Sequence, residues 1–209
     1  MTRVRIKICG ITRPEDARAA VNAGADALGL VFYPRSPRYV SLQQAREIRR
    51  AVGPFVTVVG LFLDAEPELV GAALEQVPLD LAQFHGAESA AYCAACGRPY
   101  IKAVPMSGDL DPVAYARAHP AASGFLLDSH GPGERGGTGQ AFDWARVPKT
   151  LDRPLVLAGG LRPDNVAQAV RVVRPYAVDV SSGVESEPGI KSEALIRAFI
   201  RGVARGQSG

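Results

Sequence analysis

The sequence predicts a single (β/α)8 barrel (TIM barrel) with a core of eight parallel strands, spanning residues 1–209 as one catalytic domain. Short runs rich in β-branched residues alternate along the chain with amphipathic stretches, which is typical of βαβ units. The predicted strands begin 21 to 31 residues apart, enough for one strand, one helix and two loops but not for a second domain. Strict alternation implies a parallel sheet with right-handed crossovers. An open doubly wound sheet is the alternative, but eight nearly equal units in 209 residues favour the closed barrel.

Each strand is predicted from an apolar run that is bounded by turn residues. In chain order the predicted strands are Val4–Cys9, Ala27–Phe32, Phe55–Phe62, Leu79–Phe84, Tyr100–Val104, Gly124–Asp128, Leu155–Ala158 and Ala177–Val180. In such a barrel the carboxyl ends of all the strands meet at one rim, and the loops that follow them carry the chemistry.

Helices are predicted from capping signals and from glycine or proline at their ends. Thr12-Arg13-Pro14-Glu15 predicts a capping box that opens a helix to about Ala23, followed by Gly24. Ser41-Leu42-Gln43-Gln44 predicts a second capping box, and Gly53-Pro54 is expected to end that helix. The remaining helices are expected over Glu66–Gln76, Ser89–Ala95, Asp111–Ala118, Asp164–Val173 and Lys191–Val203, with a short one after Phe142-Asp143-Trp144.

Composition and charge exclude several classes of protein. Only 22% of residues are charged and 47% are hydrophobic, which is typical of a folded domain rather than a disordered chain. The net charge of +3 is spread without any long basic run, so we expect no nucleic-acid partner. No apolar stretch approaches the roughly 20 residues that span a bilayer, and no signal sequence opens the chain. Three cysteines do not make a disulfide framework, and we expect a cytoplasmic protein without a membrane partner.

Two reactive side chains fall at the carboxyl ends of predicted strands. Alternation along the first strand places Lys7 and Cys9 on its inner face, with Cys9 at the rim beside Gly10. The sixth strand delivers Asp128 to the same rim. A free cysteine is commonly a small buried apolar residue, and an aspartate after a strand is commonly a helix cap. No helix begins after Asp128, however, and the glycine-rich loop Ser129–Gln140 that follows is predicted to be a lid.

Small residues and arginines gather in other loops of the same rim. Gly159-Gly160 follows the seventh strand and Ser182-Gly183 the eighth, the usual phosphate-binding positions of this barrel class. After the second strand, the proline-punctuated loop Tyr33–Tyr39 carries two arginines. This loop is either a solvated turn or a site where an arginine binds a substrate carboxylate through two parallel hydrogen bonds.

The order and spelling of these motifs resemble a known enzyme family. The motifs are Lys7-Ile8-Cys9-Gly10-Ile11-Thr12, Phe32-Tyr33-Pro34 with Ser36 and Arg38-Tyr39, Gln83-Phe84-His85-Gly86, Leu127-Asp128, Gly136-Gly137-Thr138-Gly139, Phe142-Asp143-Trp144, Ala158-Gly159-Gly160-Leu161 and Val178-Asp179-Val180-Ser181-Ser182-Gly183-Val184-Glu185. Together they resemble the phosphoribosylanthranilate isomerases of tryptophan biosynthesis, over essentially the whole chain.

The resemblance implies an Amadori rearrangement by general acid–base catalysis, without a metal or an organic cofactor. It implies that Cys9 is the general base and Asp128 the general acid. As an acid near neutral pH, Asp128 would need a raised pKa, and Cys9 would need thiolate character that the neighbouring Lys7 could favour.

The resemblance also implies how a small phosphosugar substrate is held. Arg38 would bind its anthranilate carboxylate, Asp179 would face the sugar, and the phosphate would bind Gly159, Gly160, Ser182 and Gly183. His85 and Gln83 share a strand face and belong to the pocket, in roles that the sequence leaves open. Some relatives are dimers, so a homodimer is expected.

Three other functions compete with this interpretation. The isomerase of histidine biosynthesis performs the same chemistry on a related barrel, but with aspartates in both roles, which Cys9 argues against. A Schiff-base aldolase or an indole-glycerol-phosphate synthase would use Lys102 or Lys7. A non-catalytic phosphosugar-binding barrel would not need an acid and a base at one rim. Finally, Cys93-Ala94-Ala95-Cys96 has the spacing of a metal or redox pair, but without a second pair it is interpreted as helix packing.

Overall fold

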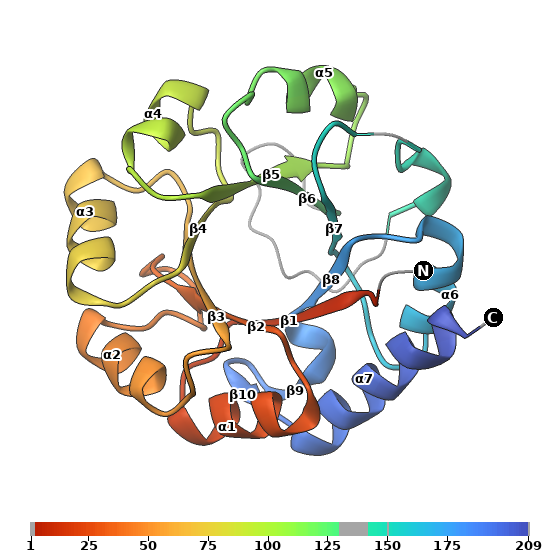
Figure 1. Ribbon diagram of the computed structural model, residues 1–209, viewed down its shortest axis with the longest axis horizontal. Helices are drawn as coiled ribbons and strands as arrows, with labels where there is room; N and C mark the ends of the chain where they lie inside the picture. Colours follow the sequence, from red (N-terminus) through yellow and green to blue (C-terminus); the bar gives the residue numbers. More distant parts are fainter. Residues whose placement is uncertain (1–2, 130–141, 150, 209) are drawn as a thin grey trace.

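Eight parallel strands close into a barrel in the computed structural model, which describes residues 3–129, 142–149 and 151–208. Each strand pairs with the next in chain order, and β1 pairs with β8 to close the ring, as Figure 1 shows down the barrel axis. The strands are β1 (Arg5–Cys9), β2 (Ala27–Val31), β3 (Thr57–Phe62), β4 (Leu81–Phe84), β5 (Tyr100–Pro105), β6 (Gly124–Asp128), β7 (Leu155–Leu157) and β8 (Ala177–Val180). The predicted fold class is confirmed, and no strand end differs from its prediction by more than two residues.

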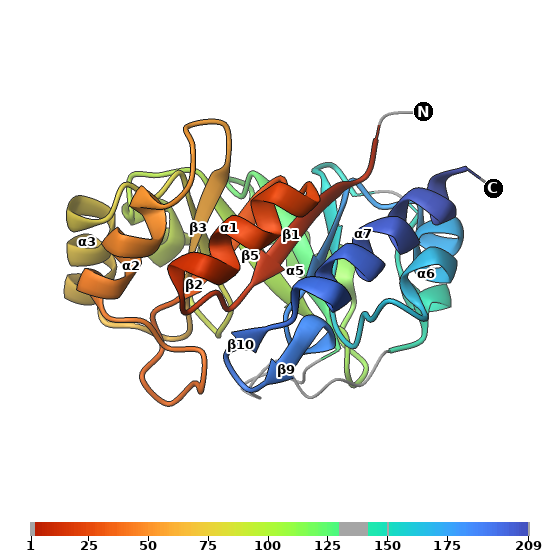
Figure 2. The same cartoon turned by 90° about the horizontal axis from the view of Figure 1, so that it is seen from below.

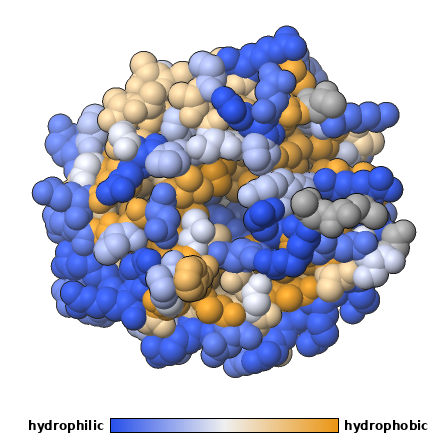
Figure 3. Space-filling model, viewed as in Figure 1, coloured by the Kyte–Doolittle hydropathy of each residue, from blue (hydrophilic) through white to orange (hydrophobic). Residues whose placement is uncertain are grey.

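Helices surround the barrel and alternate with its strands. They are α1 (Pro14–Ala23), α2 (Leu42–Arg50), α3 (Pro67–Gln76), α4 (Ala90–Ala95), α5 (Pro112–Arg117), the short 3₁₀ helix η1 (Trp144–Arg146), α6 (Val166–Val173), a second 3₁₀ turn η2 (Ser182–Val184) and α7 (Glu193–Gln207). Figure 3 shows hydrophilic side chains around the outer edge of the molecule and apolar ones towards its centre. This distribution is the one that helices with one apolar face produce when they pack on a barrel.

The two predicted capping boxes have different outcomes. At Ser41 the box is confirmed, because its hydroxyl accepts from the Gln44 amide N–H while the Gln44 side chain accepts from the Ser41 amide N–H. At Thr12 the prediction is wrong, because Arg13 is the residue that precedes α1 and it makes no side-chain cap. The Thr12 hydroxyl instead donates to the carbonyl of Gly189, 2.5 Å away. The Thr12 hydroxyl is therefore bonded to a residue 177 positions along the chain and does not cap the helix next to it.

An additional hairpin follows the eighth strand and corrects the prediction for the last helix. Strands β9 (Glu185–Glu187) and β10 (Ile190–Lys191) form a two-stranded antiparallel sheet. The helix predicted from Lys191 to Val203 therefore begins two residues later, at Glu193, and continues to Gln207. Figure 2 shows this hairpin and the loop after β2 on one side of the barrel, and both chain ends on the opposite side.

The barrel wall is packed on both faces. Outward-facing residues form the larger apolar core under the helices, where Phe32, Phe62 and Phe84 lie in sequence on neighbouring strands. A smaller cluster around Leu126 lies on the strand face that also carries Asp128. Alternation on β6 thus anchors the strand from both sides and leaves its last side chain at the rim. Among the described residues, no helix is both long and apolar enough to cross a membrane.

Candidate active site

A cavity of about 190 Å³ opens at the rim where the strands end. Its wall combines side chains from the ends of β1, β3, β4, β6 and β8 with the loop after β2. The five residues predicted to catalyse the reaction or to bind the sugar and the carboxylate all line it: Cys9, Arg38, His85, Asp128 and Asp179. They are separated by up to 170 residues in sequence and meet because parallel strands bring their carboxyl ends to one rim.

Cys9 is fixed at the end of β1 by its neighbour on β2. The two strands place Cys9 directly opposite Gly29, and a Cβ at Gly29 would lie 2.6 Å from the Cys9 sulfur. Only glycine leaves room there for the thiol. Burial raises the pKa of the Cys9 thiol, while the positive charge of Lys7 acts in the opposite direction. Lys7 is thus beside Cys9 as predicted, but its effect on the pKa is smaller than that of burial.

Lys7 and Asp179 form a buried ion pair across the seam between β1 and β8. Lys7 Nζ lies 2.8 Å from Asp179 Oδ1, and the side chains are only 5% and 9% exposed. Burial alone would lower the pKa of Lys7, but Asp179 and Cys9 outweigh it and the pKa is raised. A permanently charged amine is a poor nucleophile, which argues against a Schiff base on Lys7.

Asp128 belongs to a chain of polar side chains that crosses the pocket. Its Oδ2 lies 3.4 Å from His85 Nε2, and His85 Nδ1 lies 3.0 Å from the Gln83 amide nitrogen. All three side chains line the cavity; Gln83 is fully buried, and His85 and Asp128 are each 8% exposed. The arrangement gives His85 a place that the sequence could not assign, between the side chains of Gln83 and Asp128.

The two small-residue turns lie next to each other beside the cavity, and none of the four predicted phosphate-binding residues lines the cavity itself. Gly159 and Gly160 adopt left-handed backbone angles, with φ of 80° and 63°. A Cβ at Gly159 would lie 2.5 Å from the Ser129 nitrogen, and one at Gly183 would overlap the carbonyl oxygen of Leu161. The turn after β8 therefore packs directly against the turn after β7, as a shared phosphate site requires.

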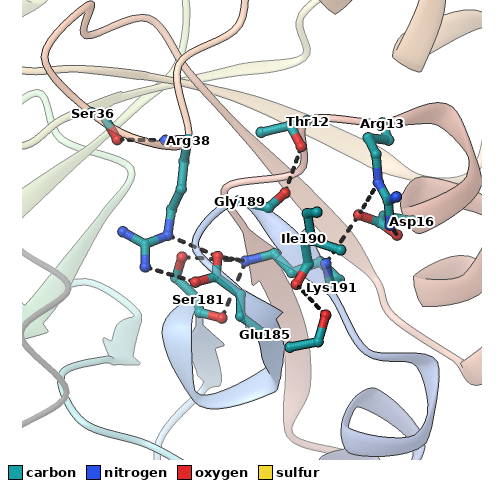
Figure 4. Close-up of polar contacts among 11 residues, drawn as sticks. Thr12, Arg13, Asp16, Ser36, Arg38, Ser181, Glu185, Gly189, Ile190 and Lys191 are labelled. Atoms are coloured by element: carbon teal, nitrogen blue, oxygen red, sulfur yellow. Dashed lines mark hydrogen bonds and ion pairs between the residues drawn. The ribbon is translucent and has the colours of Figure 1, made fainter.

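Arg38 reaches the cavity from the loop after β2, but its guanidinium already has a partner. Its Nε and Nη2 each donate to a carboxylate oxygen of Glu185 at 2.8 Å. Lys191 donates to the same carboxylate at 2.7 Å, and Figure 4 shows the three side chains together. Glu185 was part of the recognised motif, yet sequence reasoning missed its role and that of Lys191, because the contacts depend on the unpredicted hairpin.

Lys102, the other possible Schiff-base residue, is not in the cavity wall. It is fully buried, and its Nζ lies 2.9 Å from Glu88 Oε2 and 2.5 Å from the carbonyl oxygen of Gly86. These contacts tie β5 to the loop after β4, which explains a buried lysine without assigning it chemistry.

The cysteines Cys93 and Cys96, in α4 and at its end, pack against the apolar core, whereas most of the predicted lid lies outside the described residues. Cys93 is buried in the apolar core with a pKa raised to about 12 by burial, and Cys96 is also a free thiol. Over the described ranges, no group of three or more histidine, cysteine or acidic side chains could hold a metal ion. Residues 130–140 of the predicted lid lie outside the described residues.

An acid and a thiol at one barrel rim, with paired small-residue turns after β7 and β8, are the features expected of a sugar-phosphate isomerase of the (β/α)8 class. The sequence model of the N-(5'-phosphoribosyl)anthranilate (PRA) isomerase family matches residues 6–202, and the chain belongs to this family.

Relatives with known names and structures are similar over nearly the whole chain. The N-(5'-phosphoribosyl)anthranilate isomerase of Pseudomonas fluorescens Pf0-1 is 59% identical, covering 97% of this chain and 100% of the relative. The phosphoribosyl anthranilate isomerase of Thermotoga maritima superimposes with a TM-score of 0.88 at 45% identity, covering 96% of this chain and 98% of the other. A further isomerase structure contains reduced 1-(o-carboxyphenylamino)-1-deoxyribulose 5-phosphate and matches with a TM-score of 0.82 at 41% identity over 96% and 98% of the two chains.

Proposed function

We propose that Cys9 is the general base and Asp128 the general acid of the reaction for which the family is named. The enzyme isomerises N-(5-phospho-D-ribosyl)anthranilate to 1-(2-carboxyphenylamino)-1-deoxy-D-ribulose 5-phosphate, a step of tryptophan biosynthesis. This Amadori rearrangement is an internal redox reaction that turns an aldose derivative into a ketose. The proposal rests on one observation: the thiol of Cys9 and the carboxyl group of Asp128, both buried side chains, line the same cavity at the barrel rim.

The two proton transfers follow from the positions of these groups. Asp128 protonates the ring oxygen of the furanose, and the ring opens to a Schiff base between C1′ and the aryl nitrogen. Cys9 then removes the proton from C2′, which gives an enolamine that tautomerises to the ketone. Asp128 gives up a proton and Cys9 takes one. Exchange of protons with solvent between turnovers therefore restores both groups. The second step needs Cys9 as a thiolate. Burial raises the pKa of Cys9 and disfavours the thiolate, whereas the adjacent positive charge of Lys7 stabilises it.

The remaining residues hold the substrate. Arg38 binds the anthranilate carboxylate, and Asp179 and His85 face the sugar. The phosphate binds at the paired turns, through Gly159, Gly160, Ser182 and Gly183. Backbone N–H groups at glycine turns suit a phosphate because they donate hydrogen bonds and no side chain keeps the anion away. A related isomerase structure contains a reduced carboxyphenylamino-deoxyribulose phosphate, which supports binding of a phosphosugar of this kind.

The test is turnover by the purified protein with EDTA present, followed by the loss of substrate fluorescence. Cys9→Ala and Asp128→Asn should each nearly abolish turnover while circular dichroism shows an intact fold. Cys93→Ala is the matched control, because this cysteine is also buried but lies outside the cavity. Full activity of either variant would overturn the role of that residue. The histidine-pathway substrate, assayed in parallel, tests for a second activity, and trapping of an adduct by borohydride would favour the Schiff-base class.

The assembly and location of the enzyme complete the proposal. A related structure, of monomers generated from the dimeric isomerase of Thermotoga maritima, is 40% identical to this chain with a TM-score of 0.85. We infer that the enzyme is a homodimer in the cytoplasm. Sedimentation equilibrium would test the homodimer. A monomer at micromolar concentration would refute it.

A further inference from the structure

The contacts of Arg38 form a closed network between the loop after β2 and the β9–β10 hairpin. Glu185 accepts two hydrogen bonds from the Arg38 guanidinium and one from Lys191. Lys191 also donates to the carbonyl and hydroxyl oxygens of Ser181, at 3.1 and 3.4 Å, and Ser181 lines the cavity. Figure 4 shows Glu185 between the two cations, with Lys191 reaching it from β10.

The network is nearly dry and carries an excess of positive charge. The side chains of Lys191, Glu185 and Arg38 are 0%, 6% and 14% exposed. Burial alone would raise the pKa of Glu185, but the hydrogen bonds and charges of Arg38 and Lys191 outweigh it and lower the pKa. Glu185 is therefore ionised, and it faces the basic groups of Arg38 and Lys191. Burial lowers the pKa of Lys191, while the charge of Glu185 acts in the opposite direction. Two cations that face one anion beside a cavity favour an anionic group in that cavity.

The geometry also shows which edge of Arg38 is left for a ligand. Glu185 occupies the edge formed by Nε and Nη2 through two parallel hydrogen bonds, which fixes the plane of the guanidinium. The third nitrogen, Nη1, points away from Glu185 in Figure 4 and has no hydrogen-bond partner among the described residues. Gly10 leaves room for the aliphatic part of the Arg38 side chain, because a Cβ at Gly10 would lie 2.5 Å from Arg38 Cδ.

We propose that Glu185, itself held by Lys191, is a positioning residue that directs Arg38 Nη1 at the substrate's carboxylate and so makes the enzyme selective for an ortho-carboxylated arylamine. This proposal rests on the proposed role of Arg38 in binding that carboxylate. Lys191 keeps the carboxylate of Glu185 in place when the substrate arrives, so the substrate binds at the open edge of Arg38 and does not displace Glu185.

A pair of stable ligands isolates this effect from a general loss of structure. One ligand is reduced 1-(o-carboxyphenylamino)-1-deoxyribulose 5-phosphate, and the other is the same compound without its carboxylate. Dissociation constants for both are measured by calorimetry on the full-length enzyme. Glu185→Gln keeps the shape of the side chain but removes its charge, so its affinity for the carboxylated ligand should fall about tenfold or more. Affinity for the ligand without the carboxylate should stay within about twofold.

Variants at three other positions separate the possible outcomes. Lys191→Met removes the surplus charge while leaving the Arg38–Glu185 pair, so it should show the same selective loss and serves if Glu185→Gln folds poorly. Glu187→Gln, on the exposed side of the same hairpin, is the matched control and should change neither affinity. Equal losses for both ligands, or tighter binding of the carboxylated ligand by Glu185→Gln, would overturn the proposal. Arg38→Met tests the underlying role: if it leaves both affinities unchanged, Arg38 does not bind the carboxylate at all, whereas a selective loss there with none at Glu185 refutes only the positioning.

Discussion

Replacing Gly29 with alanine tests whether the position of the Cys9 sulfur controls catalysis. The new Cβ would lie 2.6 Å from the sulfur and 3.1 and 3.2 Å from Cys9 Cα and Cβ. Ordinary contact needs about 3.5–4.0 Å, so the sulfur must move by roughly 1 Å or turn to another rotamer. Rotation alone cannot relieve the contacts with Cα and Cβ, so the strands must also shift.

The size of the effect follows from this displacement. A misplacement of about 1 Å at a reacting group can lower the rate about 100-fold, so kcat/KM should fall by about that factor. Overpacking costs about 1–3 kcal/mol, which lowers Tm by roughly 2–12 °C for a domain of this size. The protein should therefore remain folded at assay temperature while it loses activity.

The assay is steady-state turnover of phosphoribosylanthranilate beside thermal melting by circular dichroism. Gly71→Ala is the matched control, because this glycine lies in α3 and a Cβ there would meet nothing within 4 Å. It should keep full activity and gain about 0.5–1 kcal/mol, as helix propensity dictates. A Gly29→Ala enzyme with kcat/KM within about twofold of the unaltered enzyme would show that catalysis does not depend on where the thiol lies.

Three other predictions rest on separate contacts. In Asp128→Asn, which has no acid left to titrate, the residual kcat/KM should rise with pH between about 7 and 9, because burial raises the pKa of Cys9 and the base acts as the thiolate; a flat profile of this residual activity would contradict the role of Cys9. Lys102→Met leaves the buried carboxylate of Glu88 unpaired and should cost about 3–5 kcal/mol in urea unfolding, and adding Glu88→Gln should recover part of it; an unchanged midpoint for the single variant would be the contrary result. Ser41→Ala removes the confirmed cap of α2 and should cost about 1 kcal/mol in the same measurement, with no change in turnover.

Most of the barrel was predictable because its signals are local. Each strand is a short apolar run whose two faces are both buried, and such runs are visible without knowledge of their neighbours. Gly124–Asp128 and Ala177–Val180 have their predicted bounds, and the capping box at Ser41 is made entirely within one turn. Where every interaction lies within a few residues, pattern and structure agree.

The errors occur where a distant partner decides the local structure. Thr12 has the spacing of a cap, but its hydroxyl bonds to Gly189. The short strands β9 and β10 contain charged residues and too few apolar ones to show alternation, so the predicted start of the last helix included Lys191. That residue is buried by its contacts with Glu185 and Ser181, which no periodicity can show.

The candidate site divides along the same line. Alternation placed Cys9, Asp128 and Asp179 at the rim, and the structure gathers them around one cavity. The partners that set their electrostatics come from other elements: Glu185 meets Arg38 across 147 residues, and the burial that raises the pKa of Cys9 comes from the whole closed barrel. Sequence position therefore indicates which groups react, but not what surrounds them.

The ion pair between Lys7 and Asp179 has a consequence for how the enzyme is made. It joins the first strand to the last, across 172 residues, and it lies beside Cys9. At about 5–20 residues per second on the ribosome, roughly 10–35 s pass between synthesis of the first strand and synthesis of the last. During this interval Cys9 has left the ribosome, but the strand that packs beside it in the barrel has not yet been made. Cys9, made among the first residues, is therefore enclosed among the last, and until β8 closes the barrel it is more exposed than the 5% of the finished fold.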